Sequence, residues 1–172
     1  MAVNQTFHIN TRDLVKGQVY GLHSSAKIIE SWELEQVAAA TETVAYGAPV
    51  LRTGDRKCTQ ADAVDANFAC HGFAVRQVNR EINTRPARGA ADFDNEAEFI
   101  VGDTIPVLRT GALYVEVGEA VALNGNVFYD PAGGKYYATA TTPTAYQLTN
   151  CKYDSTGAAD GDLVLVRITE QA

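Results

Sequence analysis

Apolar and polar residues alternate along much of this chain, and a period of two indicates β-strands with one buried face. In the clearest case Leu113, Val115 and Val117 share one face, while Tyr114 and Glu116 occupy the other. Similar patterns predict further strands over residues 27–35, 68–75, 126–129 and 146–153.

One predicted strand has a different pattern. Residues 162–169 form a near-continuous run of aliphatic and β-branched side chains, which is typical of a strand covered on both faces. Helical periodicity is almost absent, because the best candidate, residues 36–42, is too short for a stable helix and has no clear cap. The chain is therefore predicted to be built from strands.

Turn-forming residues separate these strands. Asn124-Gly125, Asp130–Gly134, Asp154–Gly157 and Asp160-Gly161 combine residues that tolerate a positive φ with residues that preset a turn. Many short strands with turns at intervals of about 8 to 12 residues predict an all-β fold, either a β-sandwich with a jelly-roll-like core or a β-barrel.

Two segments lack this pattern. Residues 1–26 contain isolated apolar side chains and are predicted to form an extended N-terminal arm, ahead of a single β domain over residues 27–172. Within that domain, residues 76–102 are predicted to form a long irregular loop, and loops of such length are commonly either functional or disordered. Its arginines precede its carboxylates, so this bipolar loop is suited to pairing with itself or with a neighbouring copy.

Composition restricts the class of partner. The 172 residues have the length of one domain. Since no run of about 18 apolar residues and no basic-then-apolar start is present, we expect a soluble protein without a standard export signal and without a membrane partner. The formal charge of −7 argues against nucleic acid, whose binding rests on Lys and Arg. Three cysteines without CxxC spacing indicate buried thiols in a reducing cytoplasm.

No catalytic constellation stands out. Cys70 and His71 are neighbours in a strand pattern and should point to opposite faces, so they do not predict a nucleophile and its base. The acidic run from Asp92 to Glu98 alternates like a calcium loop but lacks the required glycine and final glutamate. A solvated loop is the better interpretation, and the aspartates of the 154–162 turns receive the same one. We expect no catalytic residue, no cofactor and no metal.

The hexapeptide PVLRTG occurs twice, at Pro49–Gly54 and at Pro106–Gly111. A duplicated active loop would need an acidic or histidine companion at a common spacing from Arg52 and Arg109, and the sequence shows none. In each copy Val and Leu alternate faces, and Thr-Gly lies where a strand is expected to turn. The repeat therefore predicts one strand-to-turn unit used twice.

An ordered set of segments resembles a known family. From about Ile28 to Ile168 the chain contains, in order, AYGAPVLRTG, GFAVRQVNRE, VGDTIPVLRTGALYVEVGEAVALNGNVFYDPAGGKYY and GDLVLVRI. Together they resemble the structural cement proteins of tailed bacteriophages, which decorate and lock the capsid. The resemblance implies a dimer or trimer on the outer surface of the major capsid protein shell, in virions assembled in the host cytoplasm. It implies neither catalysis nor a cofactor.

The resemblance also implies that arms and loops grip the capsid, which makes the arm and the bipolar loop the candidate capsid or oligomer interface. The candidate residues are Phe7, Ile9, Leu14, Val15, Val19, Tyr20, Leu22, Arg76, Arg80, Arg85, Arg88, Asp92, Asp94, Glu96 and Glu98. Two alternatives stay open at this stage. One is another virion component, such as a head-fibre base or a glycan-binding β module, and the less favoured one is a small β-fold hydrolase that uses His71 or the carboxylates of residues 92–98.

Overall fold

The described part of the chain is built from strands. The computed structural model describes residues 16–20, 27–35, 43–61, 67–76, 98–140 and 144–169. Every regular element within these ranges is a β-strand, which confirms the predicted all-β class. The strands are β1 (Ile28–Leu34), β2 (Thr43–Ala45), β3 (Pro49–Gly54), β4 (Lys57–Gln60), β5 (Asn67–Phe68), β6 (Gly72–Ala74), β7 (Glu98–Ile100), β8 (Thr104–Glu116), β9 (Asn126–Asp130), β10 (Lys135–Tyr137), β11 (Tyr146–Tyr153) and β12 (Leu163–Ile168).

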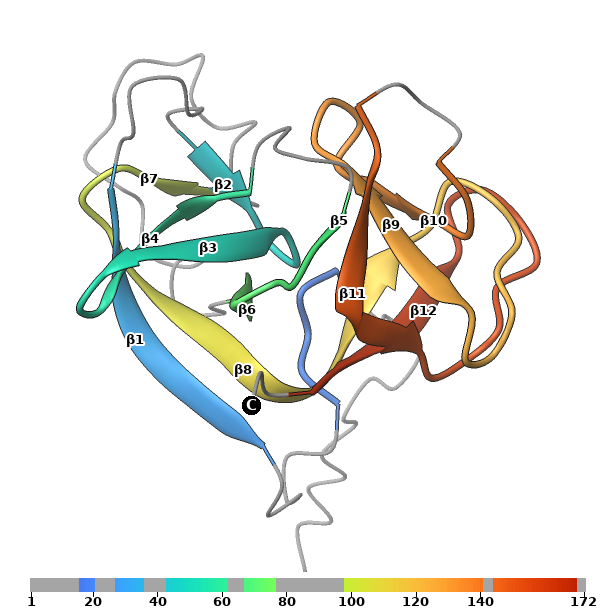
Figure 1. Cartoon of the computed structure of the whole chain (residues 1–172), viewed down its shortest axis with the longest axis horizontal. Helices are drawn as coiled ribbons and strands as arrows, with labels where there is room; N and C mark the ends of the chain where they lie inside the picture. Colours follow the sequence, from blue (N-terminus) through green and yellow to red (C-terminus); the bar gives the residue numbers. More distant parts are fainter. Residues whose placement is uncertain are drawn as a thin grey trace, which may run out of the picture.

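Five strands close into a small barrel, called here the first barrel (Figure 1). β1 pairs with β4, β4 with β3, β3 with β6, β6 with the first half of β8, and β8 again with β1. Only the β1–β4 pair is parallel. Trp32, Val50 and Val107 belong to its buried core and are at most 1% exposed. The short ribbon of β2 and β7 is a separate two-stranded sheet.

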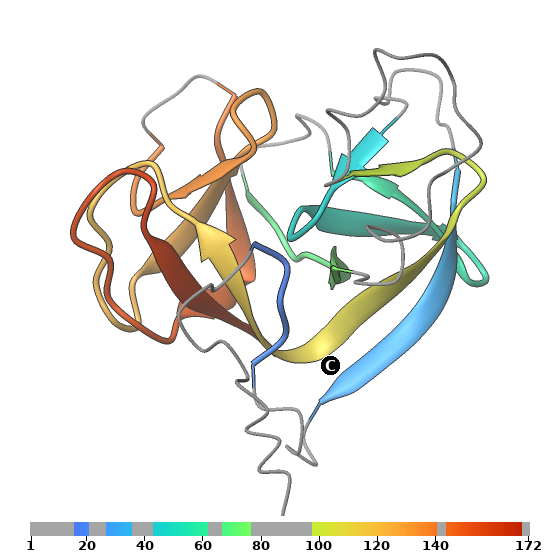
Figure 2. The same cartoon turned by 180° about the vertical axis from the view of Figure 1, so that it is seen from behind.

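The second half of β8 starts another ring, the second barrel. β12, β11, β9 and β10 follow in order, and β10 returns to the end of β8 through a bridge between Tyr136 and Val117. Gly118 N–H donates to the Tyr136 carbonyl at 2.9 Å beside that bridge. β5 adds to the edge of β11. One long strand therefore belongs to both barrels, and Figures 1 and 2 show it bending from one lobe into the other.

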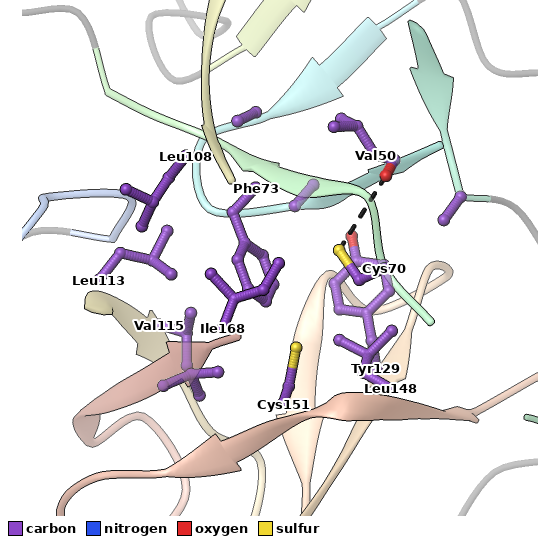
Figure 3. Close-up of a cluster of buried hydrophobic side chains, with 14 of the residues drawn as sticks. Val50, Cys70, Phe73, Leu108, Leu113, Val115, Tyr129, Leu148, Cys151 and Ile168 are labelled. Atoms are coloured by element: carbon purple, nitrogen blue, oxygen red, sulfur yellow. Dashed lines mark hydrogen bonds between the residues drawn. The ribbon is translucent and has the colours of Figure 1, made fainter. Parts of the chain in front are cut away.

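The two barrels share a buried core (Figure 3). Phe73 and Leu108 enter it from the first barrel, and Leu113, Val115 and Ile168 enter it from the second; each of these side chains is at most 1% exposed. Burial of apolar surface is the main favourable term in folding. The barrels are consequently joined by a common core as well as by β8.

A side-chain amide also joins the barrels. Asn150 on β11 accepts the Cys70 N–H at 2.9 Å and donates to the Cys70 carbonyl at 2.8 Å. Its amide nitrogen also lies 3.2 Å from the Thr169 carbonyl. This pairing satisfies the backbone of Cys70 as a neighbouring strand would, and it holds the β5–β6 connection against β11.

Several strand predictions are confirmed. β1, the second half of β8 and β11 match the predicted strands at 27–35, 112–117 and 146–153. The predicted continuous strand at 68–75 is wrong, because it is divided into β5 and β6. The helix candidate at residues 36–42 lies outside the described residues.

The prediction that residues 162–169 are covered on both faces is wrong. In β12 Val164, Val166 and Ile168 are buried, whereas Leu163 and Leu165 are only half-buried and Arg167 is exposed. The strand forms part of a barrel wall, so one face meets the core and the other meets solvent. Its outward leucines made the sequence pattern look continuous.

The second PVLRTG copy does not end in a turn. β3, the first copy, does end at Gly54 and leads through Asp55 and Arg56 into β4, but β8 continues through Gly111 to Glu116. Gly111 has a φ of 130° in the middle of that strand. Glycine adopts this conformation without steric cost, and here it lies where β8 passes from one barrel to the other.

Candidate functional site

Residues 16–20, called here the strap, are the described part of the predicted arm. Gly17 N–H donates to the Tyr114 carbonyl at 2.7 Å, and Tyr114 N–H donates to the Gln18 carbonyl at 2.8 Å, so the strap lies along the second half of β8. Arg76 N–H, at the end of the β6 segment, donates to the Gly17 carbonyl at 3.0 Å. The strap thus contacts both barrels where they meet (Figure 2).

Large apolar side chains are exposed near the bend of β8. Ile28 on β1 pairs with Thr110, just before Gly111. The Tyr20 N–H donates to the carbonyl of Ala112, just after it. Tyr20 is 55% exposed, Ile28 40% and Ile29 44%. The Tyr20 ring also lies edge-on to that of Tyr114, with centroids 6.2 Å apart. Exposed aromatic and aliphatic side chains near one another are typical of protein interaction surfaces.

Most of the predicted interface lies outside the described residues. This holds for Phe7, Ile9, Leu14, Val15, Leu22, Arg80, Arg85, Arg88, Asp92, Asp94 and Glu96. Among the rest, Val19 packs against the core, Tyr20 is exposed and Arg76 is half-buried. The backbone of Glu98 pairs with Ala45 in the β2–β7 ribbon. The interface assignment therefore stays a prediction.

Charged side chains gather at one end of the first barrel. Three of them, Glu30, Arg52 and Arg109, are each two positions along their strand from a buried core residue on β1, β3 or β8. Side chains two positions apart point to the same face of a strand, so these three lie on the core-facing side at the end of the barrel. Arg109 Nη1 lies 3.2 Å from Glu30 Oε1, and Trp32 Nε1–H donates to Glu30 Oε2 at 2.8 Å. The Arg109 guanidinium also lies 5.9 Å from the Trp32 ring centroid, within cation–π distance. Trp32 and Arg109 hold the pKa of Glu30 below its usual value.

His71 completes this group by filling a gap in the barrel wall. β6 pairs with β3 at Pro49 and Val50 only, and the Arg52 N–H further along β3 donates to His71 Nδ1 at 3.0 Å. Because Nδ1 is the acceptor, the imidazole is neutral with its proton on Nε2. Burial lowers the pKa of His71, and the positive charges of Arg109 and Arg52 lower it further. Glu30, Arg52, His71 and Arg109 are called here the mouth cluster.

The mouth cluster shows where the arginines of the two PVLRTG copies lie. Both copies supply an arginine to it, and the copies lie on the two strands that flank β6. Each arginine does have companions: Arg109 pairs with Glu30, which is 79 positions away, and the Arg52 N–H bonds His71, which is 19 positions away. Arg52 Nη2 is also 3.4 Å from Asp55 Oδ1. No fixed sequence spacing relates these partners, so a motif search does not detect them.

Mild acid should weaken the fold through His71. Because the folded state lowers the imidazole pKa, the unfolded chain gains its proton first as pH falls through the ordinary value of about 6.5, and stability is lost in that direction. We expect the melting temperature to fall more between about pH 7.5 and pH 5.5 in the wild type than in His71→Asn, whose amide oxygen can still accept the Arg52 N–H without titrating. Thermal melts in matched buffers measure this difference. Equal losses in both proteins would show that His71 is not the group responsible.

The three cysteines of the chain are buried and form no disulfide. Cys70 Sγ–H donates to the Gly72 carbonyl at 2.7 Å, and His71 is bonded to Arg52 instead. Burial raises the pKa of Cys58 to about 12 and also raises the pKa of Cys151. A thiolate nucleophile requires a lowered pKa, so Cys58 and Cys151 are not activated as nucleophiles.

The turn aspartates have structural contacts. Asp162 accepts the N–H groups of Ala158 and Ala159 at 2.7 and 3.0 Å, and Lys135 Nζ lies 2.7 Å from Asp160 Oδ1. Asp160 and Glu116 raise the pKa of Lys135 to about 12. Over the ranges that the structure describes, no group of three or more His, Cys, Asp and Glu side chains is placed to hold a metal, and no helix is long and apolar enough to cross a membrane.

Comparison with known proteins identifies the family to which the chain belongs. The family described as "Structural cement protein (E217 gp24/Pam3 gp6)" matches residues 3–169. No match is found among curated proteins. A solved structure described as "The capsid of Myoviridae Phage XM1" contains a chain that is similar with a TM-score of 0.59, at 22% identity and with 97% of each chain covered, and this similarity shows a common fold. The family resemblance of the sequence is thereby confirmed: the chain belongs to the structural cement protein family of tailed bacteriophages and is a capsid cement or decoration protein.

Proposed function

We propose that this protein binds the outer surface of the major capsid shell and stabilises the mature head. The family match over residues 3–169 is the observation that carries this proposal. A protein that binds the assembled shell and not its separated subunits stabilises the shell by mass action, and many copies on one particle add avidity. Assembly in the host cytoplasm fits the three thiols, which are all buried and free.

The arm and the bipolar loop are the proposed contact segments. Tyr20 supports this role, because it is 55% exposed at the end of a strap whose backbone is fixed on β8. A ring held by a rigid strand loses little conformational entropy on binding, so aromatic anchors of this kind contribute strongly to interfaces. Residues 1–15 precede the strap in the sequence and belong to the same predicted arm.

We further propose that the protein acts as a dimer or trimer and has no catalytic activity. The bipolar loop supports self-association, since its arginine half and its carboxylate half are complementary between copies. Sedimentation of the purified protein measures the number of copies. The thiols and turn carboxylates described above support a structural role, because their contacts satisfy them within the fold.

Co-sedimentation with heads that lack the protein tests the main proposal. We expect the full chain to bind such heads and to raise the temperature at which they release DNA. A truncation that removes residues 1–15 should keep the melting temperature of the free protein but bind heads more weakly, because the strap remains in place. Removal of residues 1–26 should also lower the melting temperature, because the strap and its bonds to β8 are lost.

Different results would contradict specific parts of the proposal. If the full chain binds glycans but not heads, the capsid role on the outer surface is wrong. If the 1–15 truncation binds heads as tightly as the full chain, the arm is not a contact segment. Heads that bind the protein but gain no heat resistance would contradict the stabilising role.

A further inference from the structure

The mouth cluster concentrates hydrogen-bond donors on a chain whose net charge is −7. Its two guanidinium groups pair with two carboxylates, Arg109 with Glu30 and Arg52 with the neighbouring Asp55, and His71 is neutral. Among the described residues the imidazole ring makes one hydrogen bond, through Nδ1, so Nε2–H is available as a further donor. The cluster is therefore rich in hydrogen-bond donors, although the protein as a whole is acidic.

Arg52 is the accessible member of the cluster. Its side chain is 47% exposed, and its ion-pair partner Asp55 is 92% exposed and 3.4 Å away. Such a solvated pair contributes little and exchanges readily for another carboxylate. By contrast, the Arg109 side chain is 24% exposed and is fixed between Glu30 and the Trp32 ring. One arginine is thus held in position while the other is able to meet a ligand.

The backbone supports this arrangement. Arg52 Nε–H donates to the Gly54 carbonyl at 2.8 Å, which fixes the side chain beside the β3–β4 turn. The imidazole is fixed by the Arg52 N–H. Since these groups are positioned before any ligand arrives, binding would require little additional ordering.

We propose that the mouth cluster is a receptor for one carboxylate of a partner polypeptide, an Asp or Glu side chain on the capsid surface. Arginine binds a carboxylate through two parallel N–H···O bonds, and a neutral imidazole adds one more donor without adding charge. A carboxylate of the partner that replaces the solvated Asp55 on Arg52 would leave the charge of the site balanced. The capsid as the source of that carboxylate rests on the proposed function, whereas the carboxylate chemistry rests on the cluster itself.

Nuclear magnetic resonance of the full-length protein tests the chemistry directly. The probe is the α-amide of N-acetylglutamate, which carries one side-chain carboxylate, with the α-amide of N-acetylglutamine as the matched neutral control, at constant ionic strength. We expect saturable shifts of the His71 imidazole and Arg52 side-chain signals with the first compound only. Arg52→Gln should weaken this binding roughly tenfold or more, as expected for the loss of a charge-assisted bond. Arg167→Gln removes an equally exposed arginine from the second barrel and should have no effect.

The opposite results would overturn the proposal. These are shifts of equal size with both compounds, shifts that do not saturate, or equal binding by Arg52→Gln and the wild type. If Arg52→Gln is poorly folded, His71→Gln provides a second variant and should also weaken binding of the probe.

Head binding then tests the source of the carboxylate. Arg52→Gln should bind heads more weakly than Arg167→Gln, by a factor similar to that seen with the probe. If both variants bind heads like the wild type, the capsid assignment of this site is wrong while the cement function stands. A change in self-association without a change in head binding would instead assign the site to a second copy and overturn the capsid partner. If the wild type itself fails to bind heads, the proposed function fails, and the probe titration still decides the carboxylate chemistry.

Discussion

Replacing Gly17 with alanine should destabilise the protein by about 2 to 4 kcal/mol, from backbone strain and overpacking together. Gly17 has a φ of 78°, and a Cβ atom there would lie 2.8 Å from the Gly47 nitrogen and 2.9 Å from the Tyr46 Cβ. Gly47 also has a φ of 78°, so two glycines meet where the strap contacts the first barrel. A shift of the Gly17 backbone would break its hydrogen bonds to Tyr114 and Arg76, and a shift of the Gly47 backbone would break the bond from its N–H to the Ala74 carbonyl. Urea denaturation measures the loss.

Gly102→Ala is the matched control. Gly102 has a φ of 87°, but nothing lies within 4 Å of a Cβ built there, so only the backbone strain applies. We expect a loss of about 1 kcal/mol, the cost of a left-handed conformation for alanine. Hydrogen exchange separates the two variants further. The Tyr114 amide, which donates to Gln18, should lose protection in Gly17→Ala but not in Gly102→Ala. Equal stability of the two variants would mean that the strap does not pack closely on Gly47.

The sequence predicts strands well where one face is buried. β11 has its predicted bounds of 146–153, because buried and less buried residues alternate along most of it. Prediction fails where tertiary structure decides. The hexapeptide is identical in the two places, so it does not by itself separate the turn after Gly54 from the bend at Gly111. The strands that pair on each side differ, and these pairings depend on the whole fold. The repeat therefore does not predict that its second copy lies inside one long strand shared by two barrels.

Part of the candidate site could likewise be predicted from the sequence, and part of it could not. The exposed Tyr20 belongs to a segment that the sequence already singles out, because the arm lacks a strand period. The mouth cluster is absent from the sequence analysis, since barrel closure brings together residues from β1, β3, β8 and the β5–β6 connection. Arg109 and Glu30 become neighbours only through the antiparallel pairing of β1 with β8. Long-range pairing of this kind leaves no fixed spacing to search for.

Replacing Leu148 with alanine in the second barrel should lower the stability of the first barrel as well. Leu148 is fully buried on β11, and loss of such a side chain costs about 2 to 5 kcal/mol through lost burial and the cavity left behind. Trp32 is the sole tryptophan of the chain and lies in the first barrel, so its fluorescence reports on that barrel alone. We expect the Trp32 transition in urea to shift to lower concentration together with the circular dichroism of the whole chain. Leu123→Ala makes the same chemical change at a side chain that is 54% exposed, and should shift both signals by at most about 0.5 kcal/mol.

The physical reason for this coupling is that neither barrel is complete without β8. Unfolding of the second barrel would free Gly111–Glu116 from β12 and expose Phe73 and Leu108, whose side chains are fully buried in the shared core. The first barrel would then lose part of its apolar burial while its own strand pairs stayed intact, which is an unfavourable intermediate. A Trp32 transition that stays in place in Leu148→Ala, while circular dichroism shows a second and earlier transition, would show that the barrels unfold separately. A single shifted transition would instead establish that the two barrels unfold as one cooperative unit.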